Sequence, residues 1–346
     1  MTQMWNEIHE QPAVIERCLK ANAGPINKIA DVIKSRGVDF VVIAARGTSD
    51  HAAVYGKYVI ELSTGIPVAL AASSVFTVYG RSLNLRNSLV IAISQSGRAA
   101  DVLEVIRSAN KEGAVTLSIT NSPGSPLANE ATYHLYCEAG PERSVAATKS
   151  FMAQIFLLGQ LAAKWAGNKD MELELSLVPD KISQTIEILS SVIEEKTARY
   201  RFMDECFVLA RGINYAVALE AALKIQETTY VRAKAFATSD FQHGPIAMVE
   251  KDMPVMAFAP DGPSFKYMEE IVDRLKQKQV ELIMVSNVKK MLDEGTCSFE
   301  IPGTENDIIS PFMNAAVAQM FACKLAVIKG LNPDSPRELN KVTVTL

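Results

Sequence analysis

No C-x-x-C pair occurs among the five cysteines of this 346-residue sequence, which are Cys18, Cys137, Cys206, Cys297 and Cys323. Because they are odd in number and far apart, we expect neither a zinc knuckle nor a disulfide framework. No apolar run approaches the ~18 residues of a membrane span, and the charged N-terminus does not resemble a signal peptide. We therefore expect a soluble protein in a reducing cytoplasm.

Basic residues are not in excess, since Lys plus Arg is 35 against 39 for Asp plus Glu and the net charge is -4. With no block of basic residues, a nucleic-acid surface is disfavoured. No G-x-G-x-x-G follows the first expected strand and no G-x-x-x-x-G-K-[ST] occurs, so neither a dinucleotide nor a nucleoside triphosphate has an obvious site. No H-x-x-H or carboxylate cluster offers a metal site, and we expect no cofactor.

The composition is that of a globular protein, with 48% apolar and 21% charged residues. The length is about twice the ~150 residues of one domain, which favours two domains. Short apolar runs alternate with helical periodicity, and this pattern is typical of the α/β class with parallel strands joined by helices. In the first half we expect one doubly wound sheet. Its strands are expected at 39–45, 66–71, 88–93, 114–119 and 133–137.

The second half repeats the first at an offset of 165 residues. Arg46-Gly47 falls on Arg211-Gly212, and Gly97 falls on Gly262. The expected strands 114–119 and 133–137 fall on 279–284 and 298–302. We therefore predict two tandem doubly wound parallel-sheet domains of flavodoxin-like topology. The predicted segments are a helical N-terminus 1–27, domains 28–180 and 181–335, and a tail 336–346.

Hydroxyl groups gather in the loops that follow three strands of the first copy. These loops contain Thr48-Ser49, Ser94-Gln95-Ser96-Gly97 and the segment 144–148. Ligands bind at the carboxyl ends of parallel strands, where helix N-termini and hydroxyls donate hydrogen bonds to anions. One such loop is more often a simple helix cap, but three on one sheet edge favour a phosphate monoester. The matching loops of the second copy, 213–214 and 259–262, have few hydroxyls.

Possible acid-base residues occur in the second copy. Glu220, Lys224 and Glu227 are spaced i, i+4, i+7, which places them on one face of a helix. By itself this spacing is more typical of a solvated salt-bridge face. His243 precedes Gly244-Pro245 in an expected rigid turn, where a histidine can transfer protons, although such a residue alone is more often structural.

Seven segments together resemble one family, the phosphosugar-binding proteins with two SIS domains, and in particular the isomerase half of glutamine-dependent glucosamine-6-phosphate synthase. The resemblance covers nearly the whole sequence in order and spacing. The matching segments are EIHEQP at 7–12, RGTS at 46–49, SQSG at 94–97, SVAATKSF at 144–151, LEAALKIQE at 219–227, HGP at 243–245 and PRELNKVTVTL at 336–346.

The resemblance implies a role for each candidate residue. Glu227 would move a proton between C1 and C2 of the sugar, with Glu220 and Lys224 completing its polar network. His243 would come from the neighbouring subunit of a homodimer and help open the ring, and Lys341 on the tail could form an imine with a keto sugar. The residues implied in substrate binding are Gly47, Thr48, Ser49, Ser94, Gln95, Ser96, Gly97, Ser144, Ala146 and Thr148.

Two departures from the synthase pattern shape the expected activity. The sugar-phosphate unit begins almost at once, without the ~200 residues of a glutaminase, so we expect that glutamine is not the nitrogen donor. The synthase-like SQSGETAD reads SQSGRAAD here. Ala99 therefore replaces a hydroxyl, and Arg98 is open to either a phosphate-side or a solvent-facing position.

These features lead us to expect a glucosamine-6-phosphate deaminase that yields fructose 6-phosphate and ammonia, acting on a small sugar phosphate without nucleic-acid or membrane partners. Three alternatives stay open: a fructosamine-6-phosphate deglycase, an aldose-ketose phosphosugar isomerase, and a non-catalytic sugar-phosphate sensor. Glu227, His243 and Lys341 favour catalysis over sensing, since a sensor needs only the phosphate site.

Overall fold

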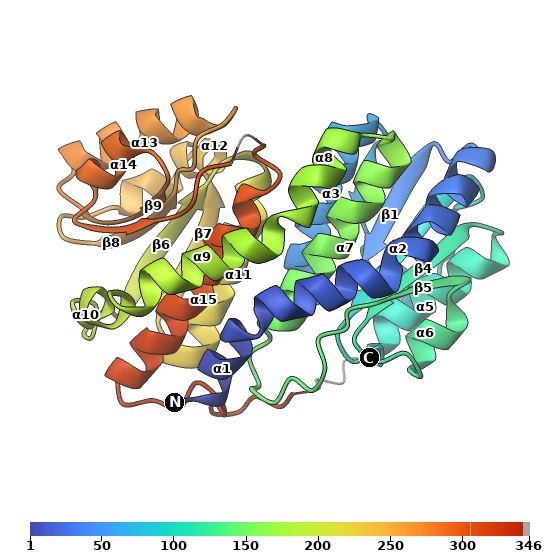
Figure 1. Ribbon diagram of the computed structural model, residues 1–346, viewed down its shortest axis with the longest axis horizontal. Helices are drawn as coiled ribbons and strands as arrows, with labels where there is room; N and C mark the ends of the chain where they lie inside the picture. The colour runs from blue at the N-terminus through green and yellow to red at the C-terminus, as the bar shows by residue number, and fades with distance from the viewer. Residues whose placement is uncertain (305, 342–346) are drawn as a thin grey trace. The chain divides into compact units, whose positions relative to one another are not determined.

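The computed structural model describes residues 1–304 and 306–341, and it contains two five-stranded sheets (Figure 1). The elements of residues 3–176, which include the first sheet, are α1 Gln3–His9, α2 Gln11–Ser35, β1 Phe40–Ala44, α3 Thr48–Thr64, β2 Val68–Leu70, α4 Ser74–Thr77, β3 Ser88–Ser94, α5 Ala100–Lys111, β4 Val115–Thr120, α6 Pro126–Glu130, β5 Tyr133–Tyr136, α7 Lys149–Ala166 and α8 Lys169–Ser176. The remaining elements are α9 Val178–Ser190, α10 Ile193–Ala198, β6 Glu205–Ala210, η1 Gly212–Asn214, α11 Tyr215–Thr229, β7 Arg232–Ala237, α12 Thr238–Gln242, η2 Pro245–Met248, β8 Pro254–Phe258, α13 Phe265–Gln277, β9 Glu281–Ser286, α14 Lys289–Glu294, β10 Cys297–Glu300 and α15 Ser310–Ile328.

The first sheet is parallel throughout, with strand order β2-β1-β3-β4-β5. Alternate side chains of its buried strands face opposite layers of helices. On one face Val42 and Val90 join the apolar cluster of α5, while on the other Ile43 lies next to Gly56 of α3 and Leu158 of α7. Because the strand order reverses between β1 and β3, the loops that follow these two strands form the ligand-binding edge of such a fold.

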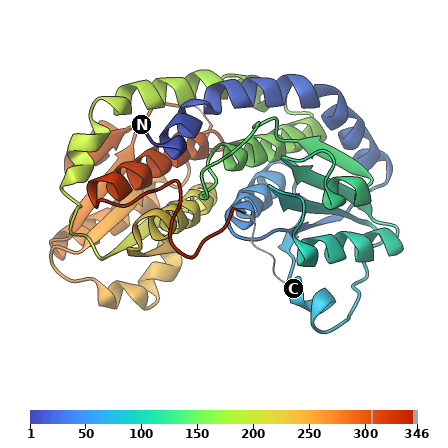
Figure 2. The ribbon, with the colours of Figure 1, turned by 90° about the horizontal axis from the view of Figure 1, so that it is seen from below.

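The second sheet repeats this topology in the order β10-β9-β8-β6-β7, again with all strands parallel. Shifting β1–β5 by 165 residues places them on β6–β10 to within two residues at each end. The predicted fold class, two tandem doubly wound α/β domains, is confirmed. In this copy α11 and α15 lie side by side (Figure 2), and α13 covers the other face through Met268, Ile271 and Leu275.

The helix α15 is the one helix of the described residues that is long and apolar enough to span a membrane by length and composition. However, 83% of its apolar window is buried inside the structure. Its neighbours include α1, α9, α10 and α11. It is therefore a core helix of the second copy.

The chain divides into two compact units that interleave along the sequence. We call them the first-sheet unit and the second-sheet unit. The first-sheet unit contains residues 11–142, 149–177 and, among the described residues, 340–341. The second-sheet unit contains 1–10, 143–148 and 178–339. The domain limits predicted from the sequence stay a prediction, and residues 342–346 of the predicted tail lie outside the described residues.

Local structure differs from the sequence expectation in the connection between the copies. The polar stretch 167–180 contains α8, because the side chain of Asn168 accepts the Met171 N–H and so caps the first turn. The sequence that follows predicts one helix over 181–200, whereas the structure has two helices there, α9 and α10, separated by two turn residues. All five cysteines are buried free thiols.

Candidate active site

Two helix N-termini lie at the strand-order reversal of the first sheet. The N-cap of α3 is Gly47, whose φ of 55° is in the left-handed region that glycine adopts most readily. The N-cap of α5 is Ala99. Neither residue makes a side-chain capping hydrogen bond. The N-cap side chains thus leave the backbone N–H groups of both first turns unoccupied at the edge where the sequence predicts an anion, and in α5 the Val102 N–H is accepted by Asp101 Oδ1.

The loop after β3 holds its hydroxyls in fixed positions. Ser94, the last residue of β3, accepts the Gly97 N–H on its Oγ at 3.1 Å. Ser96 accepts the Arg98 N–H at 3.4 Å. Each hydroxyl that accepts a backbone hydrogen bond keeps its own proton for donation. Gly97 is required here, since a Cβ would lie 2.0 Å from the Ser125 Oγ.

A buried glutamine orients the hydroxyl of the loop after β1. Gln154 of α7 donates from Nε2 to the Ser49 Oγ at 3.1 Å, and both side chains are buried. Because the Ser49 oxygen is the acceptor, its proton is available to an anion at the mouth of the sheet. Sequence reasoning missed Gln154, although a polar residue in the otherwise apolar run FMAQIFLLG was a signal for it.

For the sugar phosphate that the sequence resemblance implies as substrate, Gln154→Leu is expected to raise the KM about three- to tenfold with little change in kcat, because one orienting hydrogen bond is lost. Gln154→Glu should raise the KM further than Gln154→Leu, since a carboxylate would accept the Ser49 proton and repel the anion. Initial-rate kinetics and inhibition by inorganic phosphate measure both effects. Gln160→Leu on the same helix is the control. Equal KM values for the wild type and both Gln154 variants would contradict the orienting role.

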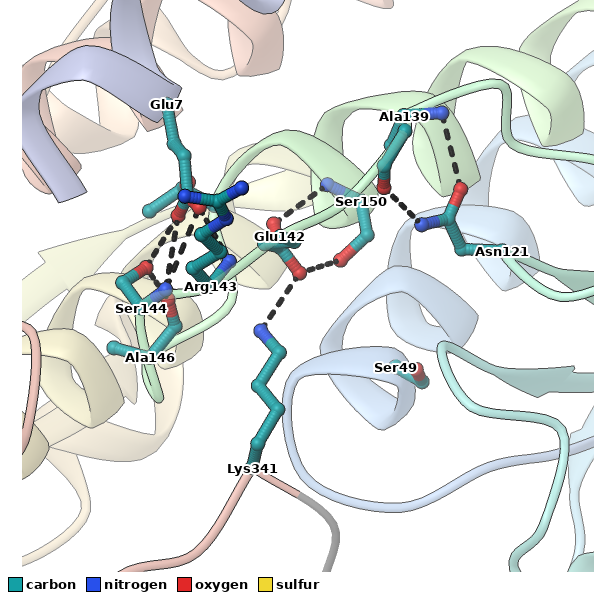
Figure 3. Close-up of polar contacts among 12 residues, drawn as sticks. Glu7, Ser49, Asn121, Ala139, Glu142, Arg143, Ser144, Ala146, Ser150 and Lys341 are labelled. Atoms are coloured by element: carbon teal, nitrogen blue, oxygen red, sulfur yellow. Dashed lines mark hydrogen bonds and ion pairs between the residues drawn. The ribbon is translucent and has the colours of Figure 1, made fainter. Parts of the chain in front are cut away.

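The described part of the tail is bound to the first-sheet unit through a buried carboxylate. Lys341 donates from Nζ to Glu142 Oε2 at 3.0 Å (Figure 3). The Glu142 side chain is fully buried and also accepts the N–H and the hydroxyl of Ser150 at 3.1 and 2.8 Å. Ser150 and Gln154 are one helical turn apart on α7, about 6 Å along its axis. The first two turns of α7 therefore hold both Lys341 and the Ser49 loop.

The second-sheet unit contains a buried cluster of two carboxylates and one ammonium on α11. Lys224 is fully buried and bonds Glu227 Oε2 at 2.5 Å and Glu220 Oε1 at 3.5 Å. Glu220 is also fully buried, whereas the Glu227 side chain is 22% exposed. The predicted helix face is thus part of the interior and not a solvated salt-bridge surface. Glu227 is the member of the cluster that solvent reaches.

The segment 143–148 belongs to the second-sheet unit, although it follows the last strand of the first sheet. The buried Glu7 carboxylate of α1 accepts the Ser144 hydroxyl at 2.5 Å and the Arg143 N–H (Figure 3). The Thr148 carbonyl accepts Gln319 of α15 at 3.3 Å. The first two contacts give a structural role to Glu7, the first residue of the EIHEQP motif, for which the sequence alone indicated none. Because the Ser144 hydroxyl donates its proton to Glu7, the segment 143–148 would have to contact a sugar through other donor groups.

His243 lies at the C-terminus of α12 and is exposed. Gly244 follows with a φ of 148°, and Pro245 begins η2. The predicted turn is therefore present. Its imidazole is accessible on the surface of the second-sheet unit.

The strand-order reversal of the second sheet is filled by buried side chains. Asn214, at the position of Ser49, donates to the Ser310 hydroxyl at 2.9 Å and accepts from Asn314 at 2.8 Å. The Asp307 carboxylate accepts the Ser310 hydroxyl at 3.3 Å. Burial raises the pKa of this carboxyl, and the Ser310 hydrogen bond acts in the opposite direction. A phosphate would have to displace this network. Of the two copies, the first has the arrangement that suits an anion.

Comparison with known proteins decides the family. The SIS domain model matches residues 37–164 and 203–329, which is one match in each sheet. The chain belongs to the SIS family. The resemblance inferred from the sequence is confirmed, and the two matches contain the hydroxyl loops and the Glu220–Glu227 helix respectively.

Among curated relatives, this SIS protein is 35% identical over 358 residues to a glutamine–fructose-6-phosphate aminotransferase (isomerizing) of Thermotoga maritima, and 34% identical over 345 residues to that of Methanothermobacter thermautotrophicus. The matches include 99% of this chain but only 58% and 57% of those proteins. The chain thus spans less than two thirds of the length of these relatives.

Solved structures give the same relationship. A protein of Silicibacter pomeroyi assigned to the phosphosugar isomerases matches with a TM-score of 0.87 and 30% identity, over 96% of this chain and all of the other. The C-terminal domain of the glucosamine-fructose-6-phosphate aminotransferase of Francisella tularensis matches with a TM-score of 0.84 and 25% identity, over 97% and 98%. The chain is an SIS protein of the phosphosugar isomerase type.

Proposed function

We propose that this SIS protein converts glucosamine 6-phosphate and water to fructose 6-phosphate and ammonia. The observation that carries the proposal is the Glu220–Lys224–Glu227 cluster. Its one partly exposed carboxylate, on Glu227, is held by a fully buried ammonium. A fixed carboxylate that solvent reaches can take up and return a proton, as isomerisation requires. The N-termini of α3 and α5, whose N-cap residues make no side-chain hydrogen bond, and the Ser49, Ser94 and Ser96 hydroxyls support a sugar phosphate as the substrate.

The proposed steps use acid-base chemistry on an open-chain sugar. His243, contributed by the neighbouring subunit of a homodimer, helps open the ring; its exposure on a turn supports this role. Glu227 removes the C2 proton to give an enolamine and returns a proton to C1, which yields fructosimine 6-phosphate. Water then adds to the imine carbon and ammonia leaves. The Lys341 ammonium, which is 25% exposed and bound to Glu142 of the first-sheet unit, supports a contact with the open-chain product.

The fold is compatible with this reaction. A glucosamine-6-phosphate deaminase of Thermotoga maritima matches over 99% of this chain and all of its own length, with a TM-score of 0.77 and 22% identity. At that identity the likeness concerns the fold alone. Neutral-sugar isomerisation and deglycation would use the same groups, so the assay has to separate them by their products.

The test is incubation of the 346-residue protein with glucosamine 6-phosphate alone, with ammonia and fructose 6-phosphate measured together. We expect equal amounts of the two products. Fructosamine 6-phosphates and glucose 6-phosphate form the comparison arms. Conversion of glucose 6-phosphate without ammonia release from the amino sugar would replace the proposal by an aldose-ketose isomerase, and preference for the larger amine adducts would replace it by a deglycase. Binding of all three without turnover would indicate a sensor.

A further inference from the structure

An ion pair joins the two loops at the strand-order reversal of the first sheet. Arg46, in the loop after β1, donates from Nε to Asp101 Oδ2 at 2.5 Å. Asp101 lies in the first turn of α5, and its Oδ1 accepts the Val102 N–H at 2.9 Å. The pair therefore connects the segment that begins α3 with the segment that begins α5. The hydroxyls of Ser49, Ser94 and Ser96 come from these same two segments.

The two partners differ sharply in exposure. The Asp101 side chain is 4% exposed, whereas that of Arg46 is 50% exposed. Only the Nε of Arg46 is bonded to Asp101. Within residues 1–304 and 306–341, no hydrogen bond occupies the two terminal nitrogens of this guanidinium. The terminal N–H groups of Arg46 are thus accessible donors, and the bond from its Nε to the buried Asp101 carboxylate fixes the orientation of the guanidinium.

The equivalent arginine of the second copy is used differently. Arg211, 165 residues after Arg46, lies over the ring of Tyr267 at 5.4 Å from its centroid. Arg211 lies in the loop after β6, at the strand-order reversal that the hydrogen-bonded side chains around Asn214 fill. The open guanidinium therefore occurs in the copy whose strand-order reversal carries the hydroxyls of Ser49, Ser94 and Ser96.

Charge explains why the first copy needs this arginine. A buried carboxylate in the first turn of α5 would repel a phosphate dianion at the same helix terminus. The Arg46 guanidinium neutralises that carboxylate, and its remaining N–H groups match the oxygen spacing of a phosphate. We propose that Arg46 is a direct phosphate-binding residue of the first-sheet unit, and that Asp101 is the positioning residue that orients it. The inference rests on the proposed function only in requiring that the site binds a phosphate monoester.

The test compares Arg46→Met and Asp101→Asn by calorimetric titration with inorganic phosphate and with glucosamine 6-phosphate. Each substitution breaks the ion pair. A purely structural bridge would therefore give equal losses. Direct contact predicts that Arg46→Met lowers the affinity for both ligands by about tenfold or more. Charge-assisted hydrogen bonds are lost, and the Asp101 charge is no longer neutralised. Asp101→Asn should weaken them less than about threefold, because the charged donors of Arg46 stay in place.

Three further variants sharpen the result. The double variant Arg46→Met/Asp101→Asn should recover part of the loss, because the repelling carboxylate is also removed. Arg46→Lys, which keeps the charge without the planar fork, should lie between the wild type and Arg46→Met. Arg107→Met is the matched control, since Arg107 lies on the same α5, is 47% exposed and pairs with Glu130 at 3.5 Å. Raising the salt concentration should reduce phosphate affinity more in the wild type than in Arg46→Met.

The possible outcomes separate this inference from the proposed reaction. Wild-type affinity in Arg46→Met, or equal losses in Arg46→Met and Asp101→Asn, would overturn the role of Arg46. Absence of phosphate binding in the wild type would overturn it together with the phosphate site. Absence of ammonia release, with phosphate binding intact and lost in Arg46→Met, would reject the deaminase and retain Arg46 as the phosphate ligand. Thermal unfolding of each variant checks that it is folded. If Arg46→Met does not fold, Arg46→Lys is used in its place for the binding comparison.

Discussion

Glu227→Gln is expected to lower the rate of ammonia release by about a thousandfold or more, while the affinity for glucosamine 6-phosphate changes less than about threefold. The amide has the shape of the carboxylate, and its oxygen can still accept the Lys224 ammonium that lies 2.5 Å from Glu227. It cannot accept the C2 proton. The measurements are kcat from coupled ammonia assays and the dissociation constant from calorimetry, because a structural role would change both.

Isotope exchange isolates the same step from the later hydrolysis. In D2O the wild type should introduce deuterium at C1 of the fructose 6-phosphate that it forms, and Glu227→Gln should introduce almost none. Glu172→Gln is the matched control, since Glu172 is 17% exposed and bonds Lys169 at the same i, i+3 spacing on α8. Turnover by Glu227→Gln above a tenth of the wild-type rate would remove Glu227 as the base.

The fold was predictable because its signals are local. Apolar runs of strand length alternate with helical periodicity, and the 165-residue offset located both copies without any spatial information. The break between α9 and α10 was not predicted, since the apolar periodicity continues across the two turn residues. The α8 helix was missed because its cap depends on one asparagine in a polar stretch. Short polar helices have little pattern to detect.

The site was predictable only in part, for a physical reason. Hydroxyl loops, and carboxylates spaced along one helix, are visible in the sequence because their members are close neighbours in it. Gln154 bonds a residue 105 positions away, Arg46 one 55 positions away and Lys341 one 199 positions away. Such pairs are created by the packing of the fold. The sequence marks Gln154 as a polar residue in an apolar run, but for none of the three does it show which residue each one bonds.

The Lys224 cluster has a second consequence, for stability. Lys224→Met keeps the length of the side chain but removes the ammonium beside two carboxylates, of which Glu220 is fully buried. Removing one partner of a buried ion pair costs about 3–5 kcal/mol, because the other charge remains in a medium of low polarity. We expect the free energy of unfolding of the second-sheet unit to fall by this amount. Lys289→Met, at an exposed i, i+4 pair on α14, should change it little.

The two tryptophans allow this loss to be assigned to one unit. Trp5 belongs to the second-sheet unit, where it packs against Lys324 at 4.2 Å, and Trp165 belongs to the first-sheet unit. In a Trp165→Phe background, tryptophan fluorescence during urea unfolding reports on the second-sheet unit alone. Adding Glu220→Gln to Lys224→Met should restore more than half of the lost stability, since the buried carboxylate that the ammonium compensates is then neutral as well. An unchanged urea midpoint in Lys224→Met, or no recovery in the double variant, would show that the ammonium does not compensate the buried Glu220 carboxylate.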